Sequence, residues 1–163
     1  PYTGMIVSTR ESADCRKHLL QLGVSQVSGG SKTSVGGYFQ PMPEKEDSAQ
    51  FDVSDKRPLD EVIKWLIDLG YLPSFCTACY RNGRTGDRFM EICKDKQIHN
   101  FCHPNAILTL KEYLEDYASP ETKAVGEKLI EEEQKTLECP ECVKLKVAED
   151  LEKIAQGGRD FNF

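Results

Sequence analysis

The sequence lacks several features that would each indicate a class of protein. Basic residues do not exceed acidic ones: 21 Lys and Arg stand against 27 Asp and Glu, for a net charge of −6. This balance excludes a general nucleic-acid binder, because phosphate affinity needs clustered positive charge. No apolar run approaches the roughly 20 residues of a membrane-spanning helix. No signal-peptide pattern opens the chain, so we expect a cytoplasmic protein that binds neither membrane nor nucleic acid.

An even number of cysteines is lacking as well. Seven cysteines in 163 residues do not match the disulfide scaffold of a secreted protein, which usually carries an even number. Two Cys-x-x-Cys pairs in a chain rich in helix formers are instead typical of metal ligands in a reducing compartment. The chain begins at Pro1 rather than at a methionine, and we expect it to be a piece of a longer chain.

The first 40 residues have the pattern of a strand, a helix and a second strand. A short apolar run over residues 4–8 precedes apolar residues at helical spacing over 11–22, and a β-branched run follows over 24–27. This order predicts a βαβ unit with parallel strands and a right-handed crossover. Because one such unit is not a stable sheet by itself, we expect residues 1–40 to belong to a larger barrel or sheet.

A loop rich in glycine and hydroxyl side chains follows the second predicted strand. Since α/β folds place ligand-binding loops at the carboxyl ends of strands, Ser28, Ser31 and Thr33 are candidate donors to an anion. Lys32 would supply the countercharge. The same composition is equally typical of a flexible linker. The spacing excludes a phosphate loop, and no helix pattern opens on the glycines as a dinucleotide fingerprint requires.

Polar residues over 41–57 predict a surface connection, and the rest of the chain, residues 58–163, has the pattern of an all-helical region. Apolar residues at helical spacing and capping signals predict helices over residues 58–69, 85–93, 102–117, 119–137 and 139–156. Their expected inner faces include Tyr117 and Leu145. Cys93 is expected to be a small buried apolar side chain.

Three cysteines carry the most specific chemistry in the sequence. Cys76 and Cys79 form a Cys-x-x-Cys pair, and 22 residues separate this pair from Cys102. Thiolates spaced in this way point to one side of a turn and bind one metal. The predicted helix start at Cys102 is expected to favour the thiolate form. Three sulfurs suit an iron–sulfur cluster with one open iron, or a zinc ion completed by His99 or His103.

Other arrangements of the cysteines remain open on the residues alone. Cys76 and Cys79 together with Cys139 and Cys142 would make a four-cysteine zinc site, although the 59 residues between the pairs exceed the usual spacing. Cys139 and Cys142 alone fit a minor metal or redox site, or two helix-start thiols without a role. A structural helical domain with reduced, unliganded thiols is also compatible with the composition.

Around the three cysteines the sequence resembles the HydG family, the radical S-adenosylmethionine tyrosine lyases of FeFe-hydrogenase maturation. The resemblance rests on the Cys-x2-Cys-x22-Cys spacing and on the segments YRNGRTG (80–86), NFCHPNA (100–106) and LKEYLEDY (110–117). It extends to both ends of the chain, through TGMI (3–6) and GRD (158–160). It implies an α/β plus α fold: the last βα elements of a TIM-type barrel over 1–40, a linker over 41–57, and a mainly helical domain over 58–163.

The resemblance also implies an activity for the full-length enzyme, of the 2-iminoacetate synthase type. Such an enzyme splits tyrosine with S-adenosylmethionine (SAM) and a 4Fe-4S cluster, and converts the dehydroglycine to carbon monoxide and cyanide for the hydrogenase. By this resemblance Cys76, Cys79 and Cys102 bind an auxiliary 4Fe-4S cluster with an additional iron. Ser28 and Lys32 would hold the substrate carboxylate, and hydrogenase maturation proteins would be the partners.

The chain also departs from the family pattern. The Cys-x3-Cys-x2-Cys motif of radical enzymes is absent from its seven cysteines. We therefore expect the first cluster, the SAM site and most of the barrel upstream of Pro1, and we expect this chain alone to be inactive. Lys32 stands where the family pattern has arginine. We assign no catalytic residue in this chain, and the alternative function is a non-catalytic zinc-binding helical module.

Overall fold

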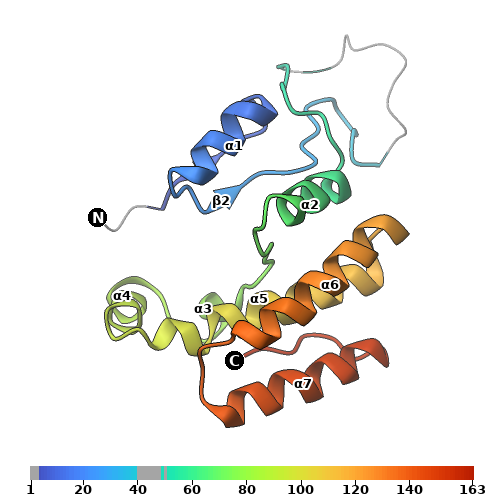
Figure 1. Cartoon of the computed structure of the whole chain (residues 1–163). Helices are drawn as coiled ribbons and strands as arrows, with labels where there is room; N and C mark the ends of the chain where they lie inside the picture. Colours follow the sequence, from blue (N-terminus) through green and yellow to red (C-terminus); the bar gives the residue numbers. More distant parts are fainter. Residues whose placement is uncertain (1–3, 40–48, 50) are drawn as a thin grey trace. The chain divides into compact units, whose positions relative to one another are not determined.

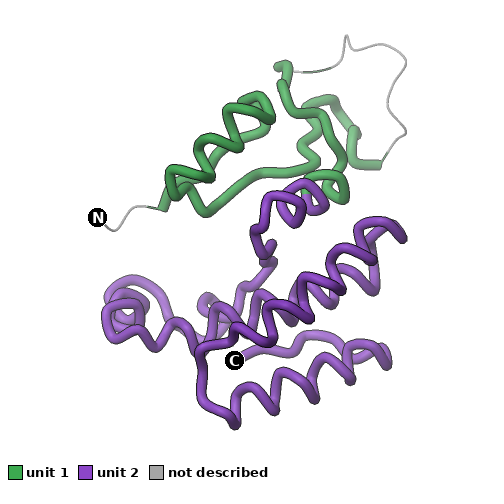
Figure 2. Tube along the Cα trace, in the orientation of Figure 1, with its two compact units in different colours: residues 1–62 green, residues 63–163 purple. Residues whose placement is uncertain are grey.

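The computed structural model describes residues 4–39, 49 and 51–163; Thr3 and most of the connection expected over 41–57 lie outside the described residues. The described chain is mostly helical and contains one two-stranded parallel sheet (Figure 1). It divides into two compact units, residues 1–62 and 63–163 (Figure 2). No helix among the described residues is both long and apolar enough to cross a bilayer.

The first unit contains the predicted strand–helix–strand pattern. Its elements are β1 (Ile6–Val7), α1 (Ala13–Gln21) and β2 (Gln26–Val27). The strands pair in parallel with Val7 opposite Val27, which confirms the predicted direction, although both strands are shorter than expected. Ser12 caps α1 by accepting a hydrogen bond from a backbone N–H of the first turn. Gly23 follows the helix with a φ of +98°, a conformation that favours glycine.

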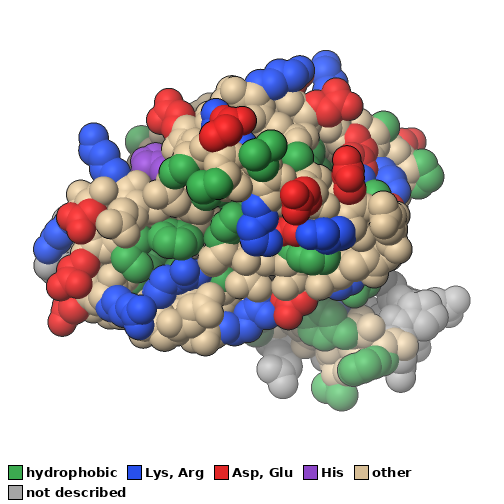
Figure 3. Space-filling model, turned by 90° about the horizontal axis from the view of Figure 1, so that it is seen from below, with side chains coloured by type: hydrophobic (Ala, Val, Ile, Leu, Met, Phe, Trp, Pro, Cys, Tyr) green, Lys and Arg blue, Asp and Glu red, His purple; other side chains and the backbone are tan. Residues whose placement is uncertain are grey.

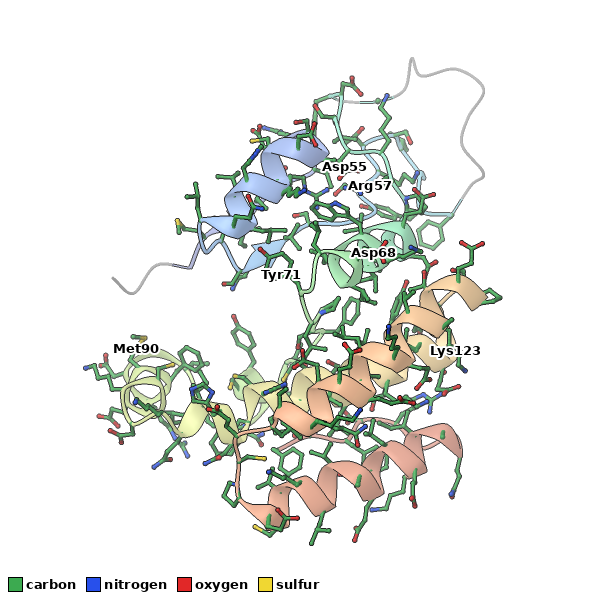
Figure 4. All side chains as sticks on the ribbon, in the orientation of Figure 1. Asp55, Arg57, Asp68, Tyr71, Met90 and Lys123 are labelled. Carbon is green, nitrogen blue, oxygen red and sulfur yellow. The ribbon has the colours of Figure 1, made fainter. Side chains whose placement is uncertain are left out.

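A buried arginine joins separate segments of the first unit. The Arg16 side chain on α1 is fully buried and donates hydrogen bonds to the Asp55 carboxylate and to the carbonyl oxygen of Ser28. Arg57 adds bonds to Asp55 from Nε at 2.8 Å and from Nη2 at 2.6 Å; Figure 4 labels both residues in the segment before α2. Asp55 was expected in a surface connection, but it is buried because two guanidinium groups compensate its charge.

Helix α2 (Leu59–Asp68) begins in the first unit and ends in the second. The second unit otherwise contains α3 (Ala78–Arg81), α4 (Gly86–Lys94), the 3-10 helix η2 (Gln97–Asn100), α5 (Cys102–Asp116), α6 (Pro120–Thr136) and α7 (Glu141–Ala155). The long helices agree with the predicted ranges to within about two residues, the usual uncertainty of a helix end. The sequence did not predict α3 and η2, because helices of four residues are too short to show a period.

Helix α5 lies at the core of the second unit. It packs against both α6 and α7, and its side chains Ile107, Leu108 and Leu110 are completely buried in the apolar core. The axes of α5 and α6 come close at Gly126, where an added Cβ would lie 2.6 Å from a methyl carbon of Leu114. The apolar core is therefore continuous across the three long helices.

Two residues of the predicted inner faces are exposed instead. Tyr117 is 76% exposed and Leu145 is 60% exposed. Tyr117 follows the last residue of α5, and Leu145 lies on α7 outside the buried positions Val147, Leu151 and Ile154. Figure 3 shows one face of the molecule, on which acidic and basic side chains are interspersed and hydrophobic side chains lie among them. Charges of one sign do not gather on that face.

Candidate metal centre

An extended segment held on α5 carries the first predicted ligand, Cys76. The ring of Phe75 stacks on Tyr113 with the ring centroids 5.2 Å apart, and the Phe75 N–H donates to the Thr109 hydroxyl at 3.3 Å. The Ala78 N–H then donates to the Cys76 sulfur at 3.5 Å, at the point where the chain turns into α3. The Cys-x-x-Cys turn is thus fixed to α5, the helix that begins with the third predicted ligand.

The three predicted ligands lie in one neighbourhood. Cys76 and Cys79 are half-buried, and Cys102, the first residue of α5, is accessible at the surface. Partial burial of its sulfur, together with the charges of Cys79, Cys76 and Cys93, raises the pKa of Cys102 to about 11, against the opposing charge of Arg84. In the metal-free chain the thiol form of Cys102 is therefore favoured, and any effect of the helix start does not dominate. Repulsion among neighbouring thiolates is relieved when a cation binds between them.

A fourth thiol, Cys93, lies close enough to Cys102 for its charge to act on that thiol. It was expected to be buried, but it is only half-buried, and no residue of α4 is fully buried. Figure 4 labels Met90 on the same helix. The apolar neighbours of Cys93 in the sequence suggested a core position, and only the tertiary structure shows its proximity to the other cysteines.

The donor set fits an iron–sulfur cluster in its chemistry. Among the described residues, no group of three or more His, Cys, Asp or Glu side chains is arranged to hold a single metal ion. The cysteines nevertheless supply three soft thiolates, the ligand type of iron–sulfur clusters. Cys76 and Cys102 come from two segments that are both fixed by α5. The residues present therefore fit such a group by ligand type.

The two histidines of the zinc alternative have different surroundings. His103 Nε2 lies 2.7 Å from Glu133 Oε2 on α6, so one of its two ring nitrogens is already engaged. His99 is exposed on η2. The alternative in which His103 completes a zinc site therefore depends on its remaining ring nitrogen.

The second Cys-x-x-Cys pair lies at the start of α7. Cys139 is half-buried against the apolar core of the second unit, and Cys142 is exposed. Burial raises the pKa of Cys139, the positive charge of Lys144 lowers it, and the charge of Cys142 raises it. The two thiols are thus neighbours. Their contacts do not assign them a role.

The first predicted substrate contact, Ser28, directly follows β2. Its N–H donates to the Val7 carbonyl oxygen at 3.0 Å, and its own carbonyl oxygen accepts from Arg16. Sequence reasoning missed Arg16 as the residue that fixes Ser28. A signal was present, because Arg16 lies four positions before Leu20 on the buried face of α1, and a buried arginine requires an anionic partner.

The second predicted substrate contact, Lys32, is half-buried in a loop that is itself hydrogen-bonded. The Lys32 N–H donates to the Tyr38 hydroxyl at 3.1 Å. The Thr33 hydroxyl donates to the Phe51 carbonyl oxygen at 2.8 Å, so this hydroxyl already has a partner and is a poorer anion donor than the sequence indicated. The loop is not a free glycine–serine linker at these positions.

Comparison with known proteins defines first a class and then a particular relative. Residues 1–72 match the family model of the Biotin and Thiamin Synthesis associated domain, which forms the C-terminal part of HydG-type radical SAM proteins. A search of curated proteins found no match. The crystal structure of HydG, described as a maturase of the FeFe-hydrogenase, matches the whole of this chain with a TM-score of 0.90 and 50% identity.

The resemblance to HydG inferred from the cysteine spacing is therefore confirmed. The chain spans about a third of the matched HydG chain, 34% of its length. Its fold, mostly helical with a small parallel sheet, corresponds to a C-terminal portion of HydG.

Proposed function

We propose that this chain is the C-terminal segment of a radical SAM tyrosine lyase that makes carbon monoxide and cyanide for the FeFe-hydrogenase. In this proposal residues 1–40 are the last βα elements of a TIM-type barrel, 41–57 connect, and 58–163 form the cluster domain. The observation that carries it is the Cys-x2-Cys-x22-Cys set, held by α5 in a chain that is 50% identical to HydG. The full-length enzyme would act in the cytoplasm, on tyrosine and SAM, with hydrogenase maturation proteins as partners.

Cys76, Cys79 and Cys102 would hold the auxiliary 4Fe-4S cluster. When bound, such a cluster with three protein ligands supplies an open iron, at which an additional iron and the two diatomic products are accommodated. The chain positions the ligands, because α5 holds the Phe75–Cys76 segment through Thr109 and begins at Cys102. The three thiols release their protons when the cationic metal is present, because its charge outweighs the repulsion between them.

Ser28 and Lys32 would contact the carboxylate of the tyrosine substrate. Ser28 is fixed at the carboxyl end of β2 by its bonds to Val7 and Arg16. Lys32 carries a positive charge in a loop fixed by Tyr38. Lysine acts on a carboxylate as a point charge, whereas arginine would bind it through two parallel hydrogen bonds. In the full-length enzyme, Lys32→Ala should therefore raise the KM for tyrosine more than it lowers kcat.

Anaerobic reconstitution with iron and sulfide tests the proposed cluster site. We expect about four irons and four sulfides per chain, as in a 4Fe-4S cluster, with broad visible absorbance. Cys79→Ser should remove the cluster, whereas Cys142→Ser, a change in the other Cys-x-x-Cys pair, should leave it intact. A colourless chain that binds one zinc ion and no iron would contradict the proposal and support the zinc-binding module.

A further inference from the structure

One arginine connects the segments that surround the cysteines. Arg84 lies between α3 and α4, and its backbone N–H donates to the Cys79 carbonyl oxygen at 2.8 Å. Its guanidinium lies over the ring of Phe101, 4.5 Å from the centroid, and Phe101 directly precedes Cys102. Its Nη2 donates to the carbonyl oxygen of Phe163 at 2.5 Å. Arg84 therefore contacts both cysteine-bearing segments and a third segment distant in sequence.

That third segment, residues 159–163, is held along α5 and is called the tail segment below. The side chain of Asn105, in the first turn of α5, accepts a hydrogen bond from the Phe163 N–H at 2.9 Å. Two turns further along the helix, Glu112 accepts from the Asp160 N–H at 2.7 Å. Asn105 is only 1% exposed, so its amide is a fixed partner. The tail segment thus gives Arg84 an acceptor that is itself fixed to the helix beginning at Cys102.

We propose, on the basis of the cluster site proposed above, that Arg84 is a positioning residue of the metal centre. It keeps the Cys79 and Cys102 segments at the separation that a shared cluster requires, and the tail segment holds its guanidinium in place. The Arg84 Nε is buried and has no hydrogen-bond partner among the described residues. The permanent positive charge of the guanidinium acts on the Cys102 sulfur and would favour an anionic cluster held there.

The contacts of Arg84 require an arginine rather than any cation. A planar guanidinium stacks on an aromatic ring and still donates from its edge, whereas a lysine ammonium is a compact point charge without this geometry. Arg84→Lys keeps the charge and removes the combination of ring contact and directed hydrogen bond. Arg88→Lys is the matched control, because Arg88 is exposed on the neighbouring helix α4.

Hydrogen exchange in the metal-free chain tests whether Arg84 holds the tail segment. In Arg84→Lys we expect the amides of Phe163 and Asp160 to exchange about tenfold faster, as the loss of one charged hydrogen bond implies. Arg88→Lys should exchange like the wild type. Equal exchange rates in the wild type and Arg84→Lys would overturn the inference that Arg84 joins these segments.

Iron content after anaerobic reconstitution measures the positioning role. We expect Arg84→Lys to retain less than about a third of the wild-type iron, with an altered electron paramagnetic resonance spectrum of the remaining cluster, while Arg88→Lys matches the wild type. Faster exchange combined with full iron content and an unchanged spectrum would overturn the positioning role. A wild-type chain that binds no cluster would overturn the proposed function instead, and the exchange comparison would still decide whether Arg84 joins the segments.

Discussion

The first unit holds its segments together with a buried group of charges, whereas the second is held by a continuous apolar core. In the first, Arg16 and Asp55 are buried together and connect α1, the segment before α2 and the loop at Ser28. In the second, α5 buries aliphatic side chains against α6 and α7. Stability should therefore depend on ionisation in the first unit and on packed volume in the second.

The first unit also exposes many large apolar side chains. They are Met5, Ile6, Leu22, Val35, Tyr38, Phe39, Phe51 and Leu59. A concentration of exposed apolar side chains in so small a unit is typical of a surface that packs on another part of a protein. This exposure supports the proposal that residues 1–40 are one piece of a larger barrel.

The largest expected effect is a cavity in the core of the second unit. Ile107 is completely buried on α5, so Ile107→Ala should lower the free energy of unfolding by about 4 kcal/mol, through lost burial and the cavity left behind. Leu145→Ala, at an exposed position of α7, should change it by less than about 0.5 kcal/mol. Urea unfolding followed by circular dichroism measures both variants. Equal effects of the two changes would show that α5 is not the core helix.

Removal of the buried carboxylate should have the next largest effect. Asp55→Ala leaves the Arg16 guanidinium buried without its anionic partner and should cost about 3 kcal/mol. The matched control is Asp52→Ala, because the Asp52 carboxylate is 84% exposed in its pair with Lys56; no measurable loss is expected there. Hydrogen exchange should locate the loss in the first unit. A loss spread evenly over both units would contradict the comparison.

Acid should weaken the first unit through the same carboxylate. The hydrogen bonds from Arg57, with the charge of Arg16, lower the pKa of Asp55 from 3.8 to about 2, against the opposing effect of burial. Because the pKa is lower in the folded chain, this stabilisation is fully present above pH 4 or so and is lost as the pH falls towards about 2. It amounts to about 2 kcal/mol. Asp55→Asn removes it, so the wild type and the variant should converge in stability as the solution is acidified. A constant difference between them would contradict the assignment.

The smallest effect should come from a helix cap in the second unit. The Ser119 hydroxyl accepts a hydrogen bond from the Thr122 N–H at the start of α6, so Ser119→Ala should cost about 1 kcal/mol. Thr85 occupies the corresponding position before α4 but makes no capping hydrogen bond. Thr85→Ala should therefore leave the urea midpoint unchanged, and equal losses in both variants would contradict the assigned role of the Ser119 hydroxyl.

Local patterns in the sequence predicted most of the helices and the direction of the strands. Hydrophobic periodicity and capping residues such as Ser119 and Gly23 act over a few residues, so they are readable without a structure. The burial of Arg16 was not readable in this way, because it depends on Asp55, 39 positions away. Leu145 was misassigned because the helical period alone does not say how wide the buried face of α7 is.

The candidate site was predictable only in part, for the same reason. The spacing of Cys76, Cys79 and Cys102 identified the family resemblance. The proximity of Cys93 and the bond from Arg84 to Phe163 depend on how distant segments pack, and 79 positions separate Arg84 from Phe163. Side chains joined across such distances leave no periodic or spacing signal in a single sequence.

The most direct test of the three-cysteine cluster compares Cys102→Ser with Cys93→Ser after anaerobic reconstitution with iron and sulfide. Each change removes one thiol from a pair whose charges act on each other. The two variants therefore differ only in whether the lost thiol is an assigned cluster ligand. We predict that Cys102→Ser loses the visible absorbance and most of the bound iron, whereas Cys93→Ser keeps both at the wild-type level. Loss of the cluster in Cys93→Ser to the same extent as in Cys102→Ser would contradict a site with three cysteine ligands and an open iron.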